Sequence, residues 1–297
     1  MQNPEFDISV IIVTYNNSGV IARCLTSLSH ALESYTSQIV VIDNDSTDNT
    51  LSILKDADFW KPFSFTAVEQ IYNNVNRGYT KGVNQGFRLS AGRFVLLLNP
   101  DVIFPTNPFE PLLSELENDD KVGIVAPQLR FLDGTIQPSC RRFPKKRDVV
   151  FEFLGLSKLF HKNPFFNGWR MPDFDHQVSR DVDQPQGAFL LTRHDVLAVV
   201  GYLDDSFPMF FSDVDWCYRI KKLGWRIRYI ATVYVYHLRG ASVKQKRAHM
   251  IISSHRSFVD YFSKHDTNWY DKCATRIIHL LLLTATPLRL LVNAKYL

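Results

Sequence analysis

The stretch that most constrains the fold is residues 93–101. Five apolar residues, 94–98, follow one another without a break and end at the turn sequence Asn99–Pro100–Asp101. A short apolar run closed by a turn is typical of a strand that is buried on both faces. Pro100 has no N–H to donate to a neighbouring strand, so pairing should end there. Asp101 is therefore predicted to lie at the carboxyl end of a central strand.

The position of Asp101 has two interpretations. Ligands of open α/β sheets bind at the carboxyl ends of the strands. A carboxylate there can hold a hard cation such as Mg²⁺, which in turn holds phosphate oxygens. The alternative is an aspartate that only forms a turn after a core strand, and this stretch alone supports both interpretations equally.

The first half of the chain repeats one pattern. An apolar run at 10–15 is followed by the polar turn 16–19 and by Ile21, Leu25 and Leu28 at helical spacing. A second run at 38–42 is followed by the capping cluster 43–50 and another helical segment. Alternating strands and helices predict an α/β fold whose mostly parallel, Rossmann-like central sheet is flanked by helices.

Later segments extend the sheet. Apolar runs predict strands at 122–127, 186–193 and 225–235, with a long irregular region at about 130–182. Residues 73–92 predict a helix with Gly78, Gly82 and Gly86 on one face. For Gly82 and Gly86 we favour close packing of the helix on a strand over contact with a ligand.

Charge and cysteine content exclude some classes of protein. The net charge is +4 over 297 residues, which gives no reason to expect a nucleic-acid partner. The four cysteines are widely separated and form no C-x-x-C pair. This spacing argues against a zinc site and a disulfide framework, and fits a reducing compartment.

Two segments raise the question of a membrane surface. Five cations lie within 141–147, directly before the apolar segment 149–156. This combination suits an anionic membrane surface or a solvated basic loop about equally. The apolar segment 276–289 suits an interfacial or a core helix, and Pro287 is expected to break it before it spans a bilayer. The N-terminus lacks the basic and apolar regions of a signal peptide.

Carboxylates also cluster where a later apolar run becomes a helix. Ser212 is expected to cap this helix, with Asp213 and Asp215 in its first turn. Carboxylates there are favoured by the helix dipole, which explains them without chemistry. His237 follows a predicted strand, where a lone histidine is more often structural than a ligand.

Taken together, these stretches resemble the inverting family 2 glycosyltransferases of the GT-A fold. The resemblance is closest to the rhamnosyltransferase-type members that build bacterial surface polysaccharides. It covers about residues 8–242, in the family's order. The matching stretches are 10–17, 40–48, 76–79 with Asn84, 97–101, 187–189, 212–217 and 237–242.

The resemblance implies a nucleotide-sugar site. Asp43 would accept a hydrogen bond from the imide N–H of uracil or thymine, since a carboxylate is only an acceptor. Asp101 ends the family's Asp-x-Asp metal motif and would hold Mg²⁺ or Mn²⁺ together with His237. The other positions expected to border the nucleotide or its phosphates are Thr14, Tyr15, Asn16, Asn76, Gly78, Asn84 and Asn99.

The resemblance also implies a mechanism. Asp213 aligns with the base that deprotonates the acceptor hydroxyl during a single, inverting displacement. Asp215 would orient its surroundings, and Arg219 would pair with a phosphate or with Asp215. The implied organisation is a glycosyltransferase domain at 1–242, with a nucleotide-sugar half at 1–125 and an acceptor half at 126–242. A helical, membrane-associating extension would follow at 243–297.

The implied reaction transfers a sugar to a lipid-linked saccharide at the cytoplasmic membrane face. Rhamnose from a dTDP donor is favoured, and other hexoses from UDP donors stay open. Asn99 and Ser212 depart from the family's usual acidic residues, so a non-catalytic nucleotide-sugar or glycan binding protein is the alternative. A sugar nucleotidyltransferase ranks last, because no Gly-rich loop follows the first strand, and a dehydrogenase would need G-x-G-x-x-G.

Overall fold

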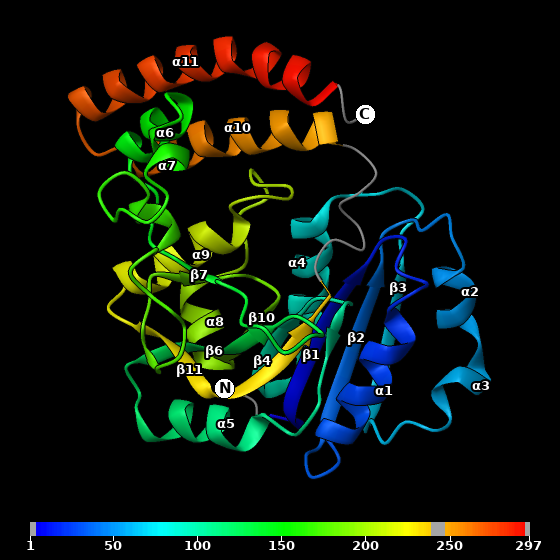
Figure 1. Cartoon of the computed structure of the whole chain (residues 1–297). Helices are drawn as coiled ribbons and strands as arrows, with labels where there is room; N and C mark the ends of the chain where they lie inside the picture. Colours follow the sequence, from blue (N-terminus) through cyan, green and yellow to red (C-terminus); the bar gives the residue numbers. More distant parts are fainter. Residues whose placement is uncertain (1–3, 239–246, 295–297) are drawn as a thin grey trace.

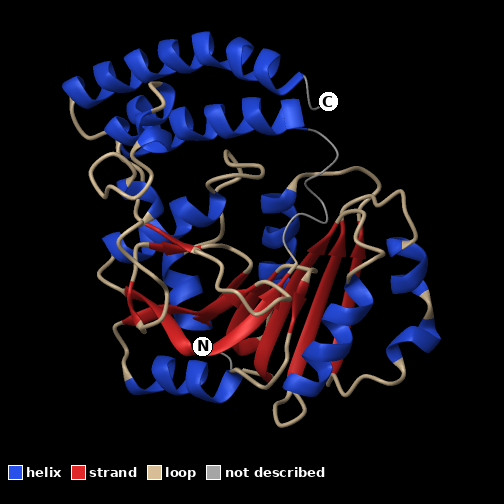
Figure 2. Cartoon of the chain, viewed as in Figure 1, coloured by secondary structure: helices blue, strands red, loops and turns tan. Residues whose placement is uncertain are grey.

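The computed structural model of the chain describes residues 4–238 and 247–294. A curled sheet lies between helices, and two long C-terminal helices form a further layer beyond its carboxyl edge (Figures 1 and 2). The strands are β1 (Phe6–Thr14), β2 (Ser37–Asp43), β3 (Ala67–Tyr72), β4 (Gly92–Leu98), β5 (Val102–Ile103), β6 (Val122–Arg130), β7 (Cys140–Arg141), β8 (Arg180–Asp181), β9 (Gln184–Pro185), β10 (Phe189–Arg193) and β11 (Arg226–His237). The helices are α1 (Ile21–Ala31), α2 (Thr50–Lys55), α3 (Ala57–Trp60), α4 (Tyr79–Leu89), α5 (Phe109–Asn118), α6 (Lys146–Phe153), α7 (Leu156–Leu159), the 3₁₀ turn η1 (Gly168–Arg170), α8 (His194–Val200), α9 (Ser212–Lys222), α10 (Arg247–His265) and α11 (Trp269–Ala294).

The main sheet has the strand order β3-β2-β1-β4-β10-β6-β11-β5, and its first four strands are parallel. Thr14 pairs with Asp43, and Ile12 pairs with Leu98. The polar residues that follow β1, β2 and β4 therefore meet at one edge, as predicted. Alternate side chains of β1 pack into the core clusters on opposite faces of the sheet, so both faces are buried.

The other half of the sheet is mixed. β10 is antiparallel to both β4 and β6, whereas β6 and β11 are parallel. The short strand β5 pairs with the end of β11, where His237 lies opposite Val102. This pairing brings His237 beside Asp101, a contact between residues far apart in the sequence. β3 was not predicted, since its half-buried residues form no continuous apolar run.

Two glycines of α4 allow the helix to approach the sheet. A Cβ on Gly82 would lie 2.8 Å from Val13 Cγ1, and one on Gly86 would lie 2.4 Å from Ile11 Cγ2. Both distances are shorter than a carbon–carbon contact permits. The interpretation of these glycines as packing residues is confirmed.

The C-terminal helices pack on each other and on α6 (Figure 1). Ile278 and Leu282 of α11 are buried in one cluster with Phe262 of α10 and Val149 of α6. The expectation that Pro287 ends this helix is wrong, because α11 continues to Ala294. Packing against α10, including a contact of 2.8 Å between His255 Nδ1 and Thr286 Oγ1, supports the helix up to the proline.

Within residues 4–238 and 247–294, no helix has the length and apolar character needed to cross a bilayer. The basic segment 141–147 leads into α6, and the region 130–182 is largely irregular, as expected. The predicted division between residues 242 and 243 lies outside the described residues.

Candidate active site

The turns after β1 and β2 form one side of the site. Asp43 is buried, and its Oδ1 accepts hydrogen bonds from Thr14 Oγ1 at 2.9 Å and Ser46 Oγ at 2.6 Å. Its Oδ2 accepts one from the Ser46 N–H at 3.0 Å. Because a carboxylate offers about four acceptor positions, Oδ2 can accept a further donor.

Asn16 joins the two turns. Its backbone is in the left-handed region, with φ of 55°, which asparagine tolerates better than most residues. Its N–H donates to Ser46 Oγ at 2.9 Å, and its Oδ1 accepts from the Thr47 N–H at 2.8 Å. The Tyr15 N–H donates to Asn17 Oδ1 at 2.8 Å. These hydrogen bonds fix the turns after β1 and β2, where Tyr15 and Asn16 are predicted to border the nucleotide.

Asn44 is a structural link that the sequence did not single out. Its Nδ2 donates to Asn76 Oδ1 at 3.2 Å and to the Gly78 carbonyl at 3.0 Å. Its Oδ1 accepts from the Arg77 N–H at 3.0 Å. The buried Asn44 therefore fixes the 76–78 turn against the end of β2, and its place next to Asp43 was the available signal.

Asn84 makes its contacts elsewhere. Its Nδ2 donates to the Leu203 carbonyl and to Asp205 Oδ1, both at 2.8 Å, and its Oδ1 accepts from the Leu203 N–H at 3.0 Å. The amide thus holds α4 against the 203–205 turn. Its role beside a nucleotide stays a prediction.

Asp101 and His237 meet as a pair. His237 Nε2 lies 3.4 Å from Asp101 Oδ1, and both side chains are almost fully buried. The Leu238 N–H also donates to the Asp101 carbonyl at 3.0 Å. The pairing of β5 with β11 therefore brings together Asp101 and His237, the two residues that the family resemblance implied as metal ligands.

Gln137 orients the imidazole of His237. Gln137 Nε2 donates to the His237 carbonyl at 2.6 Å, which leaves Gln137 Oε1 to face His237 Nδ1 at 3.0 Å. An amide oxygen only accepts, so Nδ1 carries a proton, and Nε2 faces Asp101. No sequence pattern singled out this buried glutamine.

The pair is suited to a divalent cation. Ligand bonds of about 2.1 Å allow two donor atoms to lie up to about 4.2 Å apart, and Nε2 and Oδ1 meet this condition. An imidazole nitrogen and a carboxylate oxygen suit Mn²⁺, and the carboxylate also suits Mg²⁺. Among the described residues, no group of three or more His, Cys, Asp or Glu side chains is placed to hold a metal. A cation held by this pair could take its remaining ligands from a bound diphosphate and from water.

Asp213 lies in the first turn of α9. Its Oδ2 accepts from the Gly187 N–H and from Gln184 Nε2, both at 3.1 Å. Burial raises the pKa of this carboxyl above its ordinary value. The expected N-cap is wrong, because Ser212 is the first helical residue and Phe211, with φ of 69°, precedes the helix.

The dipeptide Gly187–Ala188 connects the two acidic positions. The Ala188 carbonyl accepts from the Asn99 N–H at 2.9 Å, while the Gly187 N–H donates to Asp213. A Cβ on Gly187 would lie only 3.0 Å from Asp213 Oδ2, so glycine permits this approach. The Asn99–Asp101 turn and Asp213 are thus neighbours across one dipeptide.

The turn before α4 reaches the same place. The pKa of Tyr79, the first residue of α4, is raised mainly by burial and to a lesser degree by the charge of the nearby Asp213 carboxylate. Gly78, just before it, packs so closely that an added Cβ would lie 3.0 Å from the Pro208 carbonyl oxygen. The turn at Gly78, which is predicted to border the nucleotide, and Asp213, the predicted general base, therefore lie near the same part of the site.

Asp215 is enclosed by three basic side chains. Its side chain is fully buried, and its oxygens contact Arg219 Nε at 2.8 Å, Lys264 Nζ at 2.7 Å and His265 Nε2 at 2.9 Å. Burial alone would raise its pKa, but hydrogen bonds from these partners lower it. Arg219 thus pairs with Asp215, one of its two expected partners. Asp215 anchors α10 on α9, and a catalytic role for it stays a prediction.

Comparison with known proteins gives the class. Residues 9–172 match the family model for glycosyl transferase family 2, which is more than half of the chain. The chain therefore belongs to glycosyl transferase family 2, and it is a hexosyltransferase enzyme with the predicted GT-A fold.

Two curated relatives match most of the chain. The N-acetylglucosaminyl-diphospho-decaprenol L-rhamnosyltransferase of Mycobacterium tuberculosis H37Rv is 27% identical, over 88% of this chain and 85% of its own length. The rhamnosyltransferase WbbL of Escherichia coli K12 is 23% identical, over 77% of this chain and 82% of its own length.

Solved structures share the fold. A mannosyltransferase from Pyrobaculum calidifontis in complex with GDP-Man and Mn²⁺ aligns with a TM-score of 0.56 at 18% identity, over 98% of this chain and 75% of its own. Residues 1–349 of TarS from S. aureus, in complex with UDP, align with a TM-score of 0.54 at 15% identity, over 93% of this chain and 70% of theirs.

Proposed function

We propose that this enzyme transfers a sugar, with inversion, from a nucleotide-diphosphate sugar to a hydroxyl of a lipid-linked saccharide during synthesis of a cell-surface polysaccharide. The observation that carries the proposal is the placement of the Asp101–His237 pair and Asp213 around Gly187–Ala188. Rhamnose is the favoured sugar, because both curated relatives described above are named as rhamnosyltransferases.

The donor would bind along the turns after β1, β2 and β4. The imide N–H of uracil or thymine would donate to Asp43 Oδ2, which has a free acceptor position. Thr14, Tyr15 and Asn16 would border the base and ribose, and the 76–78 turn would lie beside the diphosphate. Asp101 and His237 would hold Mg²⁺ or Mn²⁺, with Asn99 beside them. Such a cation neutralises charge on a departing diphosphate.

Asp213 would act as the general base. Its raised pKa makes it a stronger proton acceptor than an ordinary aspartate. The carboxylate would take the proton of the acceptor hydroxyl as the oxygen attacks the anomeric carbon. The bond to the diphosphate breaks in the same step, so a covalent nucleophile is not required. The Gly187 N–H and Gln184 amide hold the carboxylate in place.

A nucleotide panel tests the donor site. We expect UDP or dTDP with Mn²⁺ to raise the melting temperature, because ligands that bind only the folded state stabilise it. CDP is the matched control, since cytosine has no imide N–H and cannot donate to Asp43 in this way. Thermal-shift measurements in which CDP stabilises the protein as well as UDP and dTDP do would contradict the role of Asp43. No stabilisation by any of the three would contradict the donor site.

Peripheral contact with the cytoplasmic face of the membrane is the second part of the proposal. Ile277, Leu280 and Leu283 lie on the exposed face of α11, each more than half exposed, beside the exposed Arg276. Exposed apolar and basic residues also share the α6–α7 region, namely Leu154, Lys158, Leu159, Phe160 and Lys162. Helices α6 and α11 contact each other, so the exposed residues of α11 and those of the α6–α7 region can face the same membrane surface.

The outer face of α11 can be tested with lipid vesicles. The double variant Ile277→Glu/Leu280→Glu should weaken co-sedimentation with phosphatidylglycerol-containing vesicles on the order of tenfold or more, because two apolar side chains would no longer enter the interface. Val199→Glu is the control, since Val199 is equally exposed but lies on α8. Equal vesicle binding by the α11 variant and the control would contradict the membrane contact.

A further inference from the structure

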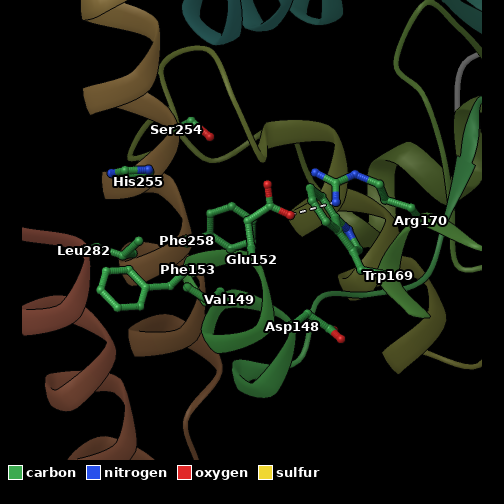
Figure 3. A pocket seen from close by; sticks show the side chains of 10 residues that line it. All are labelled: Asp148, Val149, Glu152, Phe153, Trp169, Arg170, Ser254, His255, Phe258 and Leu282. Carbon is green, nitrogen blue, oxygen red and sulfur yellow. Dashed lines mark hydrogen bonds and ion pairs between the residues drawn. The ribbon is translucent and has the colours of Figure 1, made fainter. Parts of the chain in front are cut away.

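Two pockets lie along opposite sides of α10. Ser254, His255 and Phe258 line the pocket drawn in Figure 3, together with residues of α6, η1 and α11. The other pocket has a volume of about 400 Å³, which is within the range of small-molecule sites. We call it the α10 pocket, because five of its lining residues share one face of this helix, and the rest belong to the 205–208 turn. The five are Ile252, Ser253, Arg256, Ser257 and Asp260.

The lining of the α10 pocket selects the chemistry of its ligand. Asp205 and Asp260 contribute carboxylates, Arg256 contributes a guanidinium, and three serines contribute hydroxyls. Pro208 and Ile252 add a smaller apolar surface. Two carboxylates against a single guanidinium repel a phosphate, and the many polar groups do not suit a hydrocarbon. A neutral ligand with several hydroxyls fits this lining, because each hydroxyl can both donate and accept.

Both carboxylates have acceptor positions left for a ligand. Asp205 Oδ1 accepts from Asn84 Nδ2 at 2.8 Å, and no described residue donates to its Oδ2. Asp260 Oδ2 lies 3.6 Å from Arg256 Nε, which is longer than a hydrogen bond, and no described residue donates to this carboxylate. Burial raises the pKa of Asp260, although the charges of Arg256 and His279 oppose the shift. Hydroxyl donors from a ligand would therefore satisfy a partly buried acceptor.

Pro208 joins the α10 pocket to the proposed active site. Its carbonyl oxygen accepts from the Thr80 N–H at 3.3 Å, and a Cβ added to Gly78 would lie 3.0 Å from the same oxygen. Tyr79, between these two residues, is near enough to Asp213 for the carboxylate to affect its pKa. The α10 pocket and the predicted base thus lie on two sides of the turn that begins α4.

We propose that the α10 pocket binds a sugar unit of the acceptor saccharide. The inference rests on the proposed function, in which a diphosphate is anionic and a lipid is apolar, so that the saccharide is the part that this lining fits. Sugar hydroxyls donate to Asp205 and Asp260, and sugar oxygens accept from Arg256 and the serine hydroxyls. The C–H face of the ring packs on Pro208 and Ile252. Bound in this way, the acceptor is held beside the turn that leads to Asp213.

Neutral methyl glycosides are the probes for the α10 pocket, namely those of glucose, galactose, N-acetylglucosamine and rhamnose. Titration into the full-length protein, followed by saturation-transfer NMR, should give saturable binding of at least one of them. EDTA is present throughout, so that a cation cannot bridge the sugar to a carboxylate. Inorganic diphosphate should not displace the bound glycoside, because the two carboxylates repel it.

Two neighbouring serines of α10 provide a matched pair of variants. Ser253→Leu fills space in the α10 pocket and removes a hydroxyl, so it should weaken binding of the glycoside by about tenfold or more. Ser254→Leu is the control, since Ser254 lines the pocket of Figure 3 instead, and it should bind like the wild type. Asp260→Leu removes a charged acceptor and should also weaken binding about tenfold.

The outcomes separate this inference from the proposed function. Absence of binding by every glycoside of the panel, displacement by diphosphate, or equal effects of Ser253→Leu and Ser254→Leu would overturn the assignment. If Ser253→Leu lowers the melting temperature, Asp260→Leu decides, and unchanged binding by that variant would overturn the assignment as well. The titration contains neither nucleotide nor cation. Failure of UDP and dTDP to stabilise the wild type would therefore remove the proposed function and leave the sugar-binding result to stand by itself.

Discussion

Replacing Asp213 by Asn is expected to reduce sugar transfer by about 10²- to 10⁴-fold, the usual contribution of a general base. Binding of the donor nucleotide should change little, because Asp213 lies across Gly187–Ala188 from the Asn99–Asp101 turn. Initial rates of transfer from a dTDP- or UDP-sugar, together with thermal shifts by the free nucleotide, measure the two effects. Asp195→Asn is a suitable control, since Asp195 is also in a first helical turn but is exposed.

The pH dependence should identify the same carboxyl. Burial raises the pKa of Asp213, so kcat/KM should fall on the acid side with an apparent pKa above 3.8. A raised pKa in the folded state also means that the charged carboxylate destabilises the fold once the pH exceeds this pKa. Asp213→Asn should therefore match or exceed the melting temperature of the wild type at pH 7. Near-normal transfer by this variant would exclude Asp213 as the base.

Replacing Asp215 by Asn is expected to lower the free energy of unfolding by about 3 kcal/mol, because it leaves the surrounding cations without their buried counter-charge. Asp215 is fully buried, whereas Arg219 and Lys264 keep partial contact with water, so the low end of the usual range applies. Urea unfolding at pH 7 measures the difference.

The pH dependence of this difference follows from the lowered pKa of Asp215. Stabilisation by the carboxylate is complete above its ordinary value of 3.8 and is lost as the pH falls through the lower pKa of the folded state. The gap between wild type and variant should therefore close in acid. Asp58→Asn, which removes an exposed ion pair with Lys61, should have little effect. A loss as small as that of the control would contradict the anchoring role of Asp215.

The central strands could be predicted because their signal is local. β1, β2 and β4 are buried on both faces, so each appears as an apolar run that ends in polar residues. β3 is half-buried and lacks this signal. The continuation of α11 past Pro287 depends on packing against α10, which a local pattern does not contain.

The site was predictable only in part. The polar turns pointed to Asp43 and Asp101 as residues of the sheet edge, while the roles of Asp213 and His237 came from family resemblance. The contact between His237 and Asp101 requires the two-residue strand β5 to pair with β11, a long-range event. Gln137 was missed for the same reason, since its partner is 100 residues away.

The same reasoning applies to the basic residues around Asp215. The resemblance made Arg219 a candidate partner of Asp215 or of a phosphate, and the structure contains the ion pair with Asp215. Lys264 and His265 come from the end of α10 and reach Asp215 only after the C-terminal helices pack on α9. Contacts between distant segments therefore account for most of what sequence patterns did not predict.

A crystal structure with dTDP or UDP and Mn²⁺ tests the central claim most directly. We predict that Mn²⁺ is bonded to Asp101, His237 and the diphosphate, and that the uracil or thymine ring contacts Asp43. Asp213 should face the position of the transferred sugar. A nucleotide bound away from the carboxyl edge of β1, β2 and β4, or a metal that contacts neither Asp101 nor His237, would contradict it.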